Sequence, residues 1–278
     1  MKKTVSVSAL AVIMALAVSF SSCSTVPSES KSDGTSQISA VSQQENFNSE
    51  ENKEDNVMFI KKEELTLTQE WDKTFPKSDK VDHQKVTFVN RYGITLAADM
   101  YIPKNAEGKL PAIAVSGAFG AVKEQCSGLY AQTMAERGFL TIAFDPSFTG
   151  ESGGVPRYMA SPDINTEDFM AAVDFLSLND KVDPDRIGII GICGWGGMAL
   201  NTAALDTRIK ATVASTMYDM TRVNANGYFD SEDSEEARFE KKKAMCAQRL
   251  EDLKNGEYKL GGGVVDPLPE DAPLLVKE

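Results

Sequence analysis

Residues 186–197 place the tightest constraint on how this chain can fold. They read Arg-Ile-Gly-Ile-Ile-Gly-Ile-Cys-Gly-Trp-Gly-Gly, so a β-branched run ends abruptly in glycines, and a helical pattern begins at Met198. Apolar β-branched residues favour a buried strand, and glycines allow a sharp turn that bulkier residues resist. The pattern predicts a strand, a strained turn and a helix, with one side chain held up at the turn.

Two residues compete for the apex of this turn. Small residues are needed two positions before and after the apex, because the backbone there leaves no room for a larger side chain. With Cys193 at the apex, Gly191 fits before it, but the bulky Trp195 follows it. With Trp195 at the apex, Cys193 and Gly197 flank it well, but an indole cannot attack a carbonyl. The sequence leaves open which of the two residues is at the apex, and we call these two assignments the two frames.

Hydrophobic patterning around this turn predicts an α/β fold. Residues 85–90 and 94–102 alternate and are separated by Arg-Tyr-Gly, which is typical of a hairpin. Four apolar runs are typical of buried parallel strands, and helical patterns lie between them. We therefore predict a doubly wound, mostly parallel sheet with right-handed crossovers. The four runs are residues 112–115, 139–144, 186–192 and 209–215.

The helical patterns also predict which faces are buried. The helix after the first apolar run is expected to have an inward face formed by Cys126, Leu129, Tyr130, Thr133 and Met134. The next helix is expected to begin at Asn165 or Thr166 and to bury Phe169, Ala172, Val173 and Leu176. Residues 231–257 are charge-dense with a thin apolar face, which predicts a cap-like helix over the end of the sheet.

The N-terminal residues predict export and a lipid anchor. Residues 1–22 have a basic start and an apolar stretch too short to span a bilayer, as in a signal peptide. Small residues precede Cys23, which resembles a bacterial lipobox and predicts lipidation of Cys23; an ordinary signal peptide is the alternative. Residues 23–57 are polar and predict a disordered tether. We expect a membrane-anchored protein of the bacterial cell envelope.

Charge and cysteine content exclude other classes of function. The formal charge of −12 argues against a nucleic-acid partner. The cysteines after Cys23, which are Cys126, Cys193 and Cys246, show neither a disulfide framework nor the spacing of a metal site. We therefore expect no metal and no cofactor.

Three passages carry a resemblance to a known family: residues 116–125, 145–154 and 191–197, each at the carboxyl end of a predicted strand. They resemble the α/β-hydrolase superfamily, most closely its dienelactone-hydrolase-like and Xaa-Pro-peptidase-like bacterial members. The resemblance implies hydrolysis of a small-molecule or peptide substrate at an ester, lactone or peptide bond, through an acyl-enzyme intermediate.

The same resemblance implies roles for individual residues. Cys193 is the candidate nucleophile, in a turn formed with Gly191, Trp195, Gly196 and Gly197; the alternative is a small buried residue at a strand end. The oxyanion hole would use the N–H of Gly194, or of Gly196 in the other frame. A second N–H would come from Ala118 or Phe119.

The sequence also departs from the family pattern. A hydrolase triad runs in the order nucleophile, acid, histidine, yet the one histidine is His83, expected at the surface near the first strand. Asp145 is expected to be structural. We therefore expect residues 58–278 to be an incomplete, C-terminally truncated hydrolase domain without its last strands and without triad-dependent activity. The alternatives are a non-catalytic binding lipoprotein and a non-functional fragment.

Overall fold

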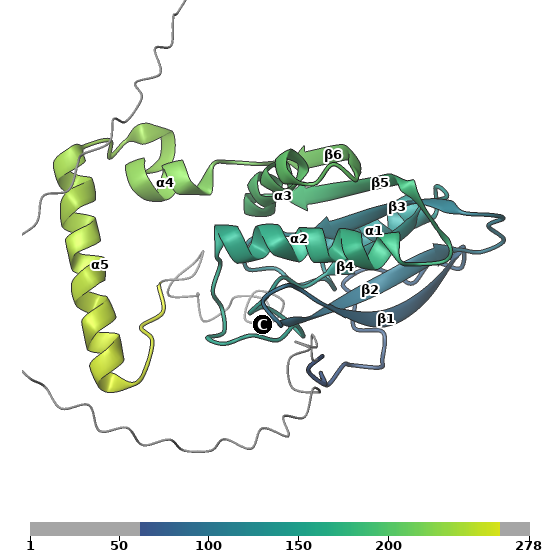
Figure 1. Ribbon diagram of the computed structural model, residues 1–278, viewed down its shortest axis with the longest axis horizontal. Helices are drawn as coiled ribbons and strands as arrows, with labels where there is room; N and C mark the ends of the chain where they lie inside the picture. Colours follow the sequence, from purple (N-terminus) through teal and green to yellow (C-terminus); the bar gives the residue numbers. More distant parts are fainter. Residues whose placement is uncertain (1–61, 262–278) are drawn as a thin grey trace, which may run out of the picture. The chain divides into compact units, whose positions relative to one another are not determined.

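The computed structural model describes residues 62–261, which form a six-stranded sheet flanked by helices (Figure 1). The strand order is β1-β2-β4-β3-β5-β6. The pairs β1–β2 and β2–β4 are antiparallel, and the remaining three pairs are parallel. The predicted α/β fold with a mostly parallel sheet is confirmed. The strands are β1 (Val81–Val89), β2 (Thr95–Pro103), β3 (Leu110–Ser116), β4 (Leu140–Phe144), β5 (Val182–Ile192) and β6 (Ile209–Ser215).

Helices cover both faces of the sheet, as a doubly wound fold requires. Helix α1 (Cys126–Ala135) packs on the face to which Tyr101 and Val115 point. Helices α2 (Pro162–Ser177) and α3 (Gly194–Leu205) pack on the opposite face, with Met100. Three further helices follow β6: α4 (Met220–Asn226), the 3-10 helix η1 (Tyr228–Asp230) and α5 (Glu235–Asn255).

The predicted inward face of α1 is wrong. Leu129 and Tyr130 are exposed, and the buried residues are Ser127, Gly128, Ala131, Gln132 and Ala135. Small residues suit this face because the segment before β1 lies close against the helix. A Cβ atom on Gly128 would lie 2.9 Å from the ring of Phe75. The Gln132 amide is buried without penalty, since it accepts from the Ser78 N–H and donates to the Pro76 carbonyl.

The inward face of α2 is confirmed, because Phe169, Ala172, Val173 and Leu176 are all fully buried. Its predicted start is wrong. The N-cap is Ser161, whose hydroxyl accepts from the Ile164 N–H, and Pro162 takes the first helical position. Proline is well suited there because it lacks the N–H that would have no acceptor. The side chain of Asn165 instead accepts from the Ser161 N–H.

The helix predicted over residues 231–257 exists as α5, but no residue of α5 is buried. Its predicted place over the end of the sheet stays a prediction. Within residues 62–261, β6 pairs with β5 alone. Val213 on β6 is 50% exposed, so this strand is an open edge in the described part of the chain.

Candidate active site

The turn between β5 and α3 puts Cys193 at its apex. Cys193 is the N-cap of α3 and has φ 58° and ψ −130°, a conformation that side-chain-bearing residues rarely adopt. Its N–H donates to the carbonyl of Ser215 at the end of β6, over 2.9 Å. The carbonyl of Cys193 accepts from the Gly196 N–H, also over 2.9 Å. Of the two frames the sequence left open, the structure adopts the one with Cys193 at the turn.

Glycines on two segments create the space for this turn. A Cβ atom on Gly191 would lie 2.2 Å from the carbonyl oxygen of Trp195, so no side chain fits there. The bulky Trp195 is tolerated two residues after the apex because the neighbouring loop supplies Gly117. A Cβ atom on Gly117 would lie 3.0 Å from the Cβ of Trp195 and 2.3 Å from the Ile192 carbonyl oxygen. The space for the bulky residue after the apex is therefore supplied by the loop after β3.

The loop after β3 lies against the turn, as the expected oxyanion hole requires. Ala118 and Cys193 pack against the same buried cluster. The ring of Phe119 meets the ring of Trp195 edge to face, with centroids 5.7 Å apart. Gly194 is the first residue of α3, so its N–H has no acceptor within the helix. The structure thus brings Cys193, Gly194, Ala118 and Phe119 into one region.

Tyr218 is a site residue that the sequence analysis missed. Burial raises the pKa of its phenol, and the neighbouring Cys193 raises that pKa further. Tyr218 follows closely on the end of β6. Since the carboxyl ends of parallel strands meet at one edge of a sheet, its place in the sequence could have indicated this contact.

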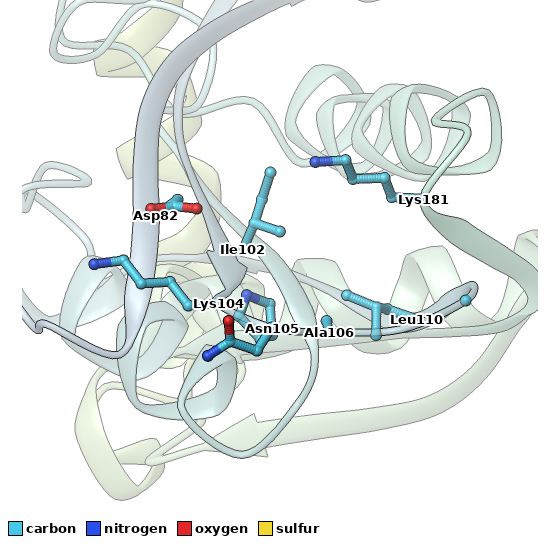
Figure 2. A pocket seen from close by; sticks show the side chains of 9 residues that line it. Asp82, Ile102, Lys104, Asn105, Ala106, Leu110 and Lys181 are labelled. Carbon is cyan, nitrogen blue, oxygen red and sulfur yellow. The ribbon is translucent and has the colours of Figure 1, made fainter.

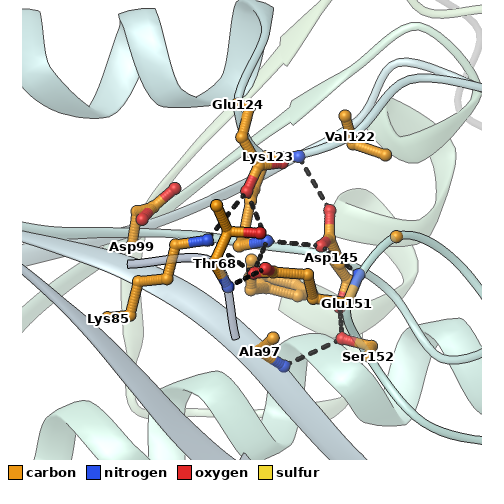
Figure 3. A network of polar contacts seen from close by, with 12 residues as sticks. Thr68, Lys85, Ala97, Asp99, Val122, Lys123, Glu124, Asp145, Glu151 and Ser152 are labelled. Carbon is orange, nitrogen blue, oxygen red and sulfur yellow. Dashed lines mark hydrogen bonds and ion pairs between the residues drawn. The ribbon is translucent and has the colours of Figure 1, made fainter. Parts of the chain in front are cut away.

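A buried ion pair fixes the loop after β3 to the end of β4 (Figure 3). The carboxylate of Asp145 accepts from the Lys123 N–H over 2.7 Å and from the Lys123 ammonium over 2.8 Å. Both side chains are fully buried. Burial alone would lower the pKa of Lys123, but the charges of Asp145 and Glu124 outweigh it and raise that pKa. Asp145 is thus structural, as expected, although its main partner is a lysine rather than its own turn.

Glu151 extends this network to the hairpin. Its carboxylate lies 2.7 Å from the ammonium groups of both Lys123 and Lys85. Burial would raise the pKa of Glu151, but hydrogen bonds from these two lysines lower it to about 2. The pKa of Glu124 shifts the opposite way, raised by burial and by the charge of Asp145.

Three carboxylates of this network, from Asp72, Glu124 and Glu151, are close enough together to resemble a metal site. The ammonium of Lys85 lies among them, at 3.3 Å from Asp72, 3.5 Å from Glu124 and 2.7 Å from Glu151. A lysine therefore already supplies the positive charge that these oxygens need. The donor set fits an ion-pair network.

His83 is not the surface residue that the sequence predicted. Its side chain is 14% exposed, and its Nε2 lies 2.7 Å from the fully buried carboxylate of Asp99. The ring also packs on Trp71 and Tyr101. His83 lies on β1, at the opposite edge of the sheet from β6. The sequence analysis missed this contact because the antiparallel register, which places His83 opposite Tyr101, is not visible in either strand alone.

Two pockets lie at opposite ends of the strands. One, of about 450 Å³, lies near the start of β3 and is lined by Asp82, Ile102, Lys104 and Lys181 (Figure 2). This is the amino end of the parallel strands, where such folds do not place their sites. The other, of about 400 Å³, includes Gly194 and Tyr218 and therefore adjoins the turn. In residues 62–261 no helix combines the length and the apolarity needed to cross a bilayer.

Several known proteins have sequences similar to this chain. Uncharacterized protein PA2218 of Pseudomonas aeruginosa is 68% identical over 194 residues, which is 69% of this chain and 52% of that protein. Its crystal structure aligns with a TM-score of 0.70 and 62% identity, over 77% of this chain and 67% of that one. Uncharacterized protein YcjY of Escherichia coli K12 is 39% identical over 63% of this chain and 58% of its own length.

A thiohydrolase, aneE of Aspergillus aculeatus, is 30% identical over 49% of this chain and 42% of its own length. This chain spans about half the length of the curated relatives it matches. The profile of the X-Pro dipeptidyl-peptidase (S15) family matches residues 92–258, more than half of the chain and all of the turn region. The chain therefore belongs to the X-Pro dipeptidyl-peptidase (S15) family of α/β hydrolases.

Proposed function

We propose that Cys193 is the nucleophile of an acyl hydrolase site in this chain. The observation that carries the proposal is the left-handed backbone of Cys193 at the turn between β5 and α3, with φ 58°. A non-glycine residue in that conformation stores strain that the surrounding structure must offset, and such strain is concentrated at functional sites. The glycines at 191 and 117 are sterically required for this one turn.

The proposed reaction begins with attack of the Cys193 thiolate on an acyl carbon. A C–S bond forms, the bond to the leaving group breaks, and the leaving alkoxide or thiolate takes a proton from water. The oxyanion that develops on the substrate would be stabilised by the N–H of Gly194 and by one from Ala118 or Phe119. Water then hydrolyses the acyl-cysteine to release the acid.

Esters, lactones and thioesters suit this site better than peptides. An amine must be protonated as it leaves, which normally requires an imidazole beside the nucleophile. The single histidine, His83, is hydrogen-bonded to Asp99 on the strand pair at the other edge of the sheet. The name of one relative, a thiohydrolase, supports a thioester among the substrates.

Burst kinetics with p-nitrophenyl acetate test the proposal. We expect one equivalent of p-nitrophenol per chain, one acetyl group on Cys193 by peptide mass spectrometry, and slow turnover afterwards. Cys193→Ala should abolish the burst, whereas Cys126→Ser should retain it. Cys126 is a suitable control because it is also partly buried and packs against the same cluster. A burst of equal size in Cys193→Ala would exclude Cys193 as the nucleophile.

A non-catalytic binding protein is the second candidate. His83 is hydrogen-bonded to Asp99, and the ionisable neighbour of the Cys193 thiol is the phenol of Tyr218. The absence of an imidazole beside the thiol favours this second candidate. In that case the protein would give no burst with any activated ester.

We also propose that Cys23 is lipidated and anchors the chain to the cell envelope. Cys23 lies outside the residues that the structure describes, and the support is the lipobox-like sequence before it. The expressed protein should fractionate with membranes, and Cys23→Ala should release it. Wild-type protein that remains entirely in the aqueous fraction would rule out the anchor.

A further inference from the structure

The pocket of about 400 Å³ beside the turn has a largely apolar lining. It lies between α3 and the segment that follows β6. Three methionines and a leucine supply most of the apolar side chains that could contact a ligand. The lining residues that matter here are Gly194, Met198, Leu200, Met217, Tyr218 and Met220.

This pocket is continuous with the surroundings of the candidate nucleophile. Gly194, which follows Cys193 in the chain, is part of its wall. Met220 lies so close that a Cβ atom on Gly194 would be 2.2 Å from its sulfur. Tyr218, whose phenol has a pKa that burial and the neighbouring Cys193 raise, is also part of the wall. The substituent on an acyl carbon that is bonded to the Cys193 sulfur would therefore lie close enough to enter this pocket.

The polar residues of the wall are already engaged within the protein. Asp219 is the one charged residue among those lining the pocket, and it caps α4 by accepting from the Thr221 hydroxyl and the Arg222 N–H. The amide of Asn201 donates to the Thr166 hydroxyl. Methionine side chains are flexible and polarizable, so they adapt to apolar groups of different shape. The lining thus favours an uncharged, apolar ligand.

Resting on the proposed function, we infer that this pocket binds the acyl chain of a neutral aliphatic ester or thioester that acylates Cys193. At roughly 30 Å³ per water-sized group, a 400 Å³ pocket holds on the order of ten non-hydrogen atoms. An octanoyl chain fits within that volume, and an acetyl group leaves most of it empty. The substrate class is therefore a medium-chain acyl group.

A series of p-nitrophenyl esters tests this inference on the full chain. The acetate, butyrate and octanoate are compared below their micellar concentrations, and the rate of acyl-Cys193 formation is measured by peptide mass spectrometry. Burial of one methylene is worth about a fourfold gain in rate when the transition state keeps the contact. We expect octanoate to acylate Cys193 roughly 100-fold faster than acetate, since about three to four methylenes are well buried.

Two variants on the same helix separate this pocket from general hydrophobic binding. Leu200 is 45% exposed and lines the pocket, whereas Leu205 is 62% exposed and does not. Leu200→Asp should lower the octanoate-to-acetate rate ratio by at least about tenfold. Leu205→Asp should leave that ratio unchanged. Met217→Thr removes apolar contact from the opposite wall and should lower the ratio even if Leu200→Asp folds poorly.

The outcomes distinguish the inference from the proposed function. Equal rates for octanoate and acetate, with Cys193 still acylated, would overturn the acyl-chain pocket and leave the nucleophile intact. A drop in the ratio of equal size in Leu205→Asp would also overturn it. Failure of every ester to acylate Cys193 would instead contradict the proposed function itself.

Discussion

Asp145 binds both the backbone and the side chain of Lys123, through hydrogen bonds of 2.7 Å to the N–H and 2.8 Å to the ammonium. Lys123 lies in the same loop, between β3 and α1, as Gly117, Ala118 and Phe119, which pass the Cys193 turn. The buried ion pair therefore fixes the conformation of the loop that would complete the oxyanion hole. The stability of the fold and the geometry of the candidate site therefore both depend on the contact between Asp145 and Lys123.

Asp145→Asn is expected to lower the free energy of unfolding by about 3–5 kcal/mol, because it removes the one fully buried carboxylate that pairs with the buried Lys123 ammonium. Chemical denaturation measures this loss. Asp180→Asn is the matched control, since Asp180 is exposed and forms no ion pair within residues 62–261. A loss below about 1 kcal/mol in Asp145→Asn would mean that the other carboxylates compensate fully.

Acid stability should depend on Glu151. Its pKa is about 2 in the folded chain against an ordinary value of 4.5, so the unfolded chain binds more protons between these limits. The stability that Glu151 contributes is complete above pH 4.5 and is lost as the pH falls toward 2. Thermal unfolding between pH 5 and about 2.5 should therefore show a weaker pH dependence in Glu151→Gln than in wild type. Parallel curves for the two proteins would contradict the assignment, and the exposed Glu107→Gln supplies a control.

Gly191→Ala should disrupt the turn, because its new Cβ atom would lie 2.2 Å from the Trp195 carbonyl oxygen and 2.7 Å from the Cβ of Ala199. We expect a loss of at least about 2 kcal/mol in unfolding free energy and of acylation at Cys193. Gly197→Ala is the matched control for folding, since the nearest atom to its Cβ would be 4.0 Å away. Equal thermal stability of the two variants would show that the turn relaxes to accept a methyl group.

Trp195 is 4% exposed, and its indole N–H has no acceptor among the described residues. Trp195→Phe removes this N–H and keeps the edge-to-face contact with Phe119, so it should change stability by no more than about 1 kcal/mol. Trp195→Ala should cost about 3–5 kcal/mol because it leaves a cavity. Thermal denaturation of both variants measures the difference, and a large loss in Trp195→Phe would reveal a partner for the indole N–H.

The sequence was sufficient for features that depend on local pattern. Apolar runs located all four parallel strands, including β6 at residues 209–215, although β6 is an exposed edge strand and not the buried strand that its sequence predicted. The inward face of α2 follows from its helical periodicity. The strand–turn–helix at Cys193 was visible because only glycines permit such a turn.

Features that depend on contacts between distant segments were not predictable in the same way. The inward face of α1 is set by Phe75 and Ser78, which precede the helix by some fifty residues. The apex of the turn was undecided because the space for Trp195 comes from Gly117 in the loop after β3. The pairing of Lys123 with Asp145 could have been predicted, since the two residues follow neighbouring strands of the sheet. The complete burial of this ion pair could not have been predicted from the sequence.

The most direct test of the account is the relative rate at which p-nitrophenyl acetate acylates Cys193 and Cys246. Cys246 lies on the exposed helix α5 and is the fully accessible thiol of the described residues, whereas Cys193 is partly buried. Accessibility alone would favour Cys246. We predict that Cys193 is acylated at least about tenfold faster than Cys246, as followed by peptide mass spectrometry over a time course at neutral pH. Faster acylation of Cys246 would contradict the claim that this turn presents a nucleophile.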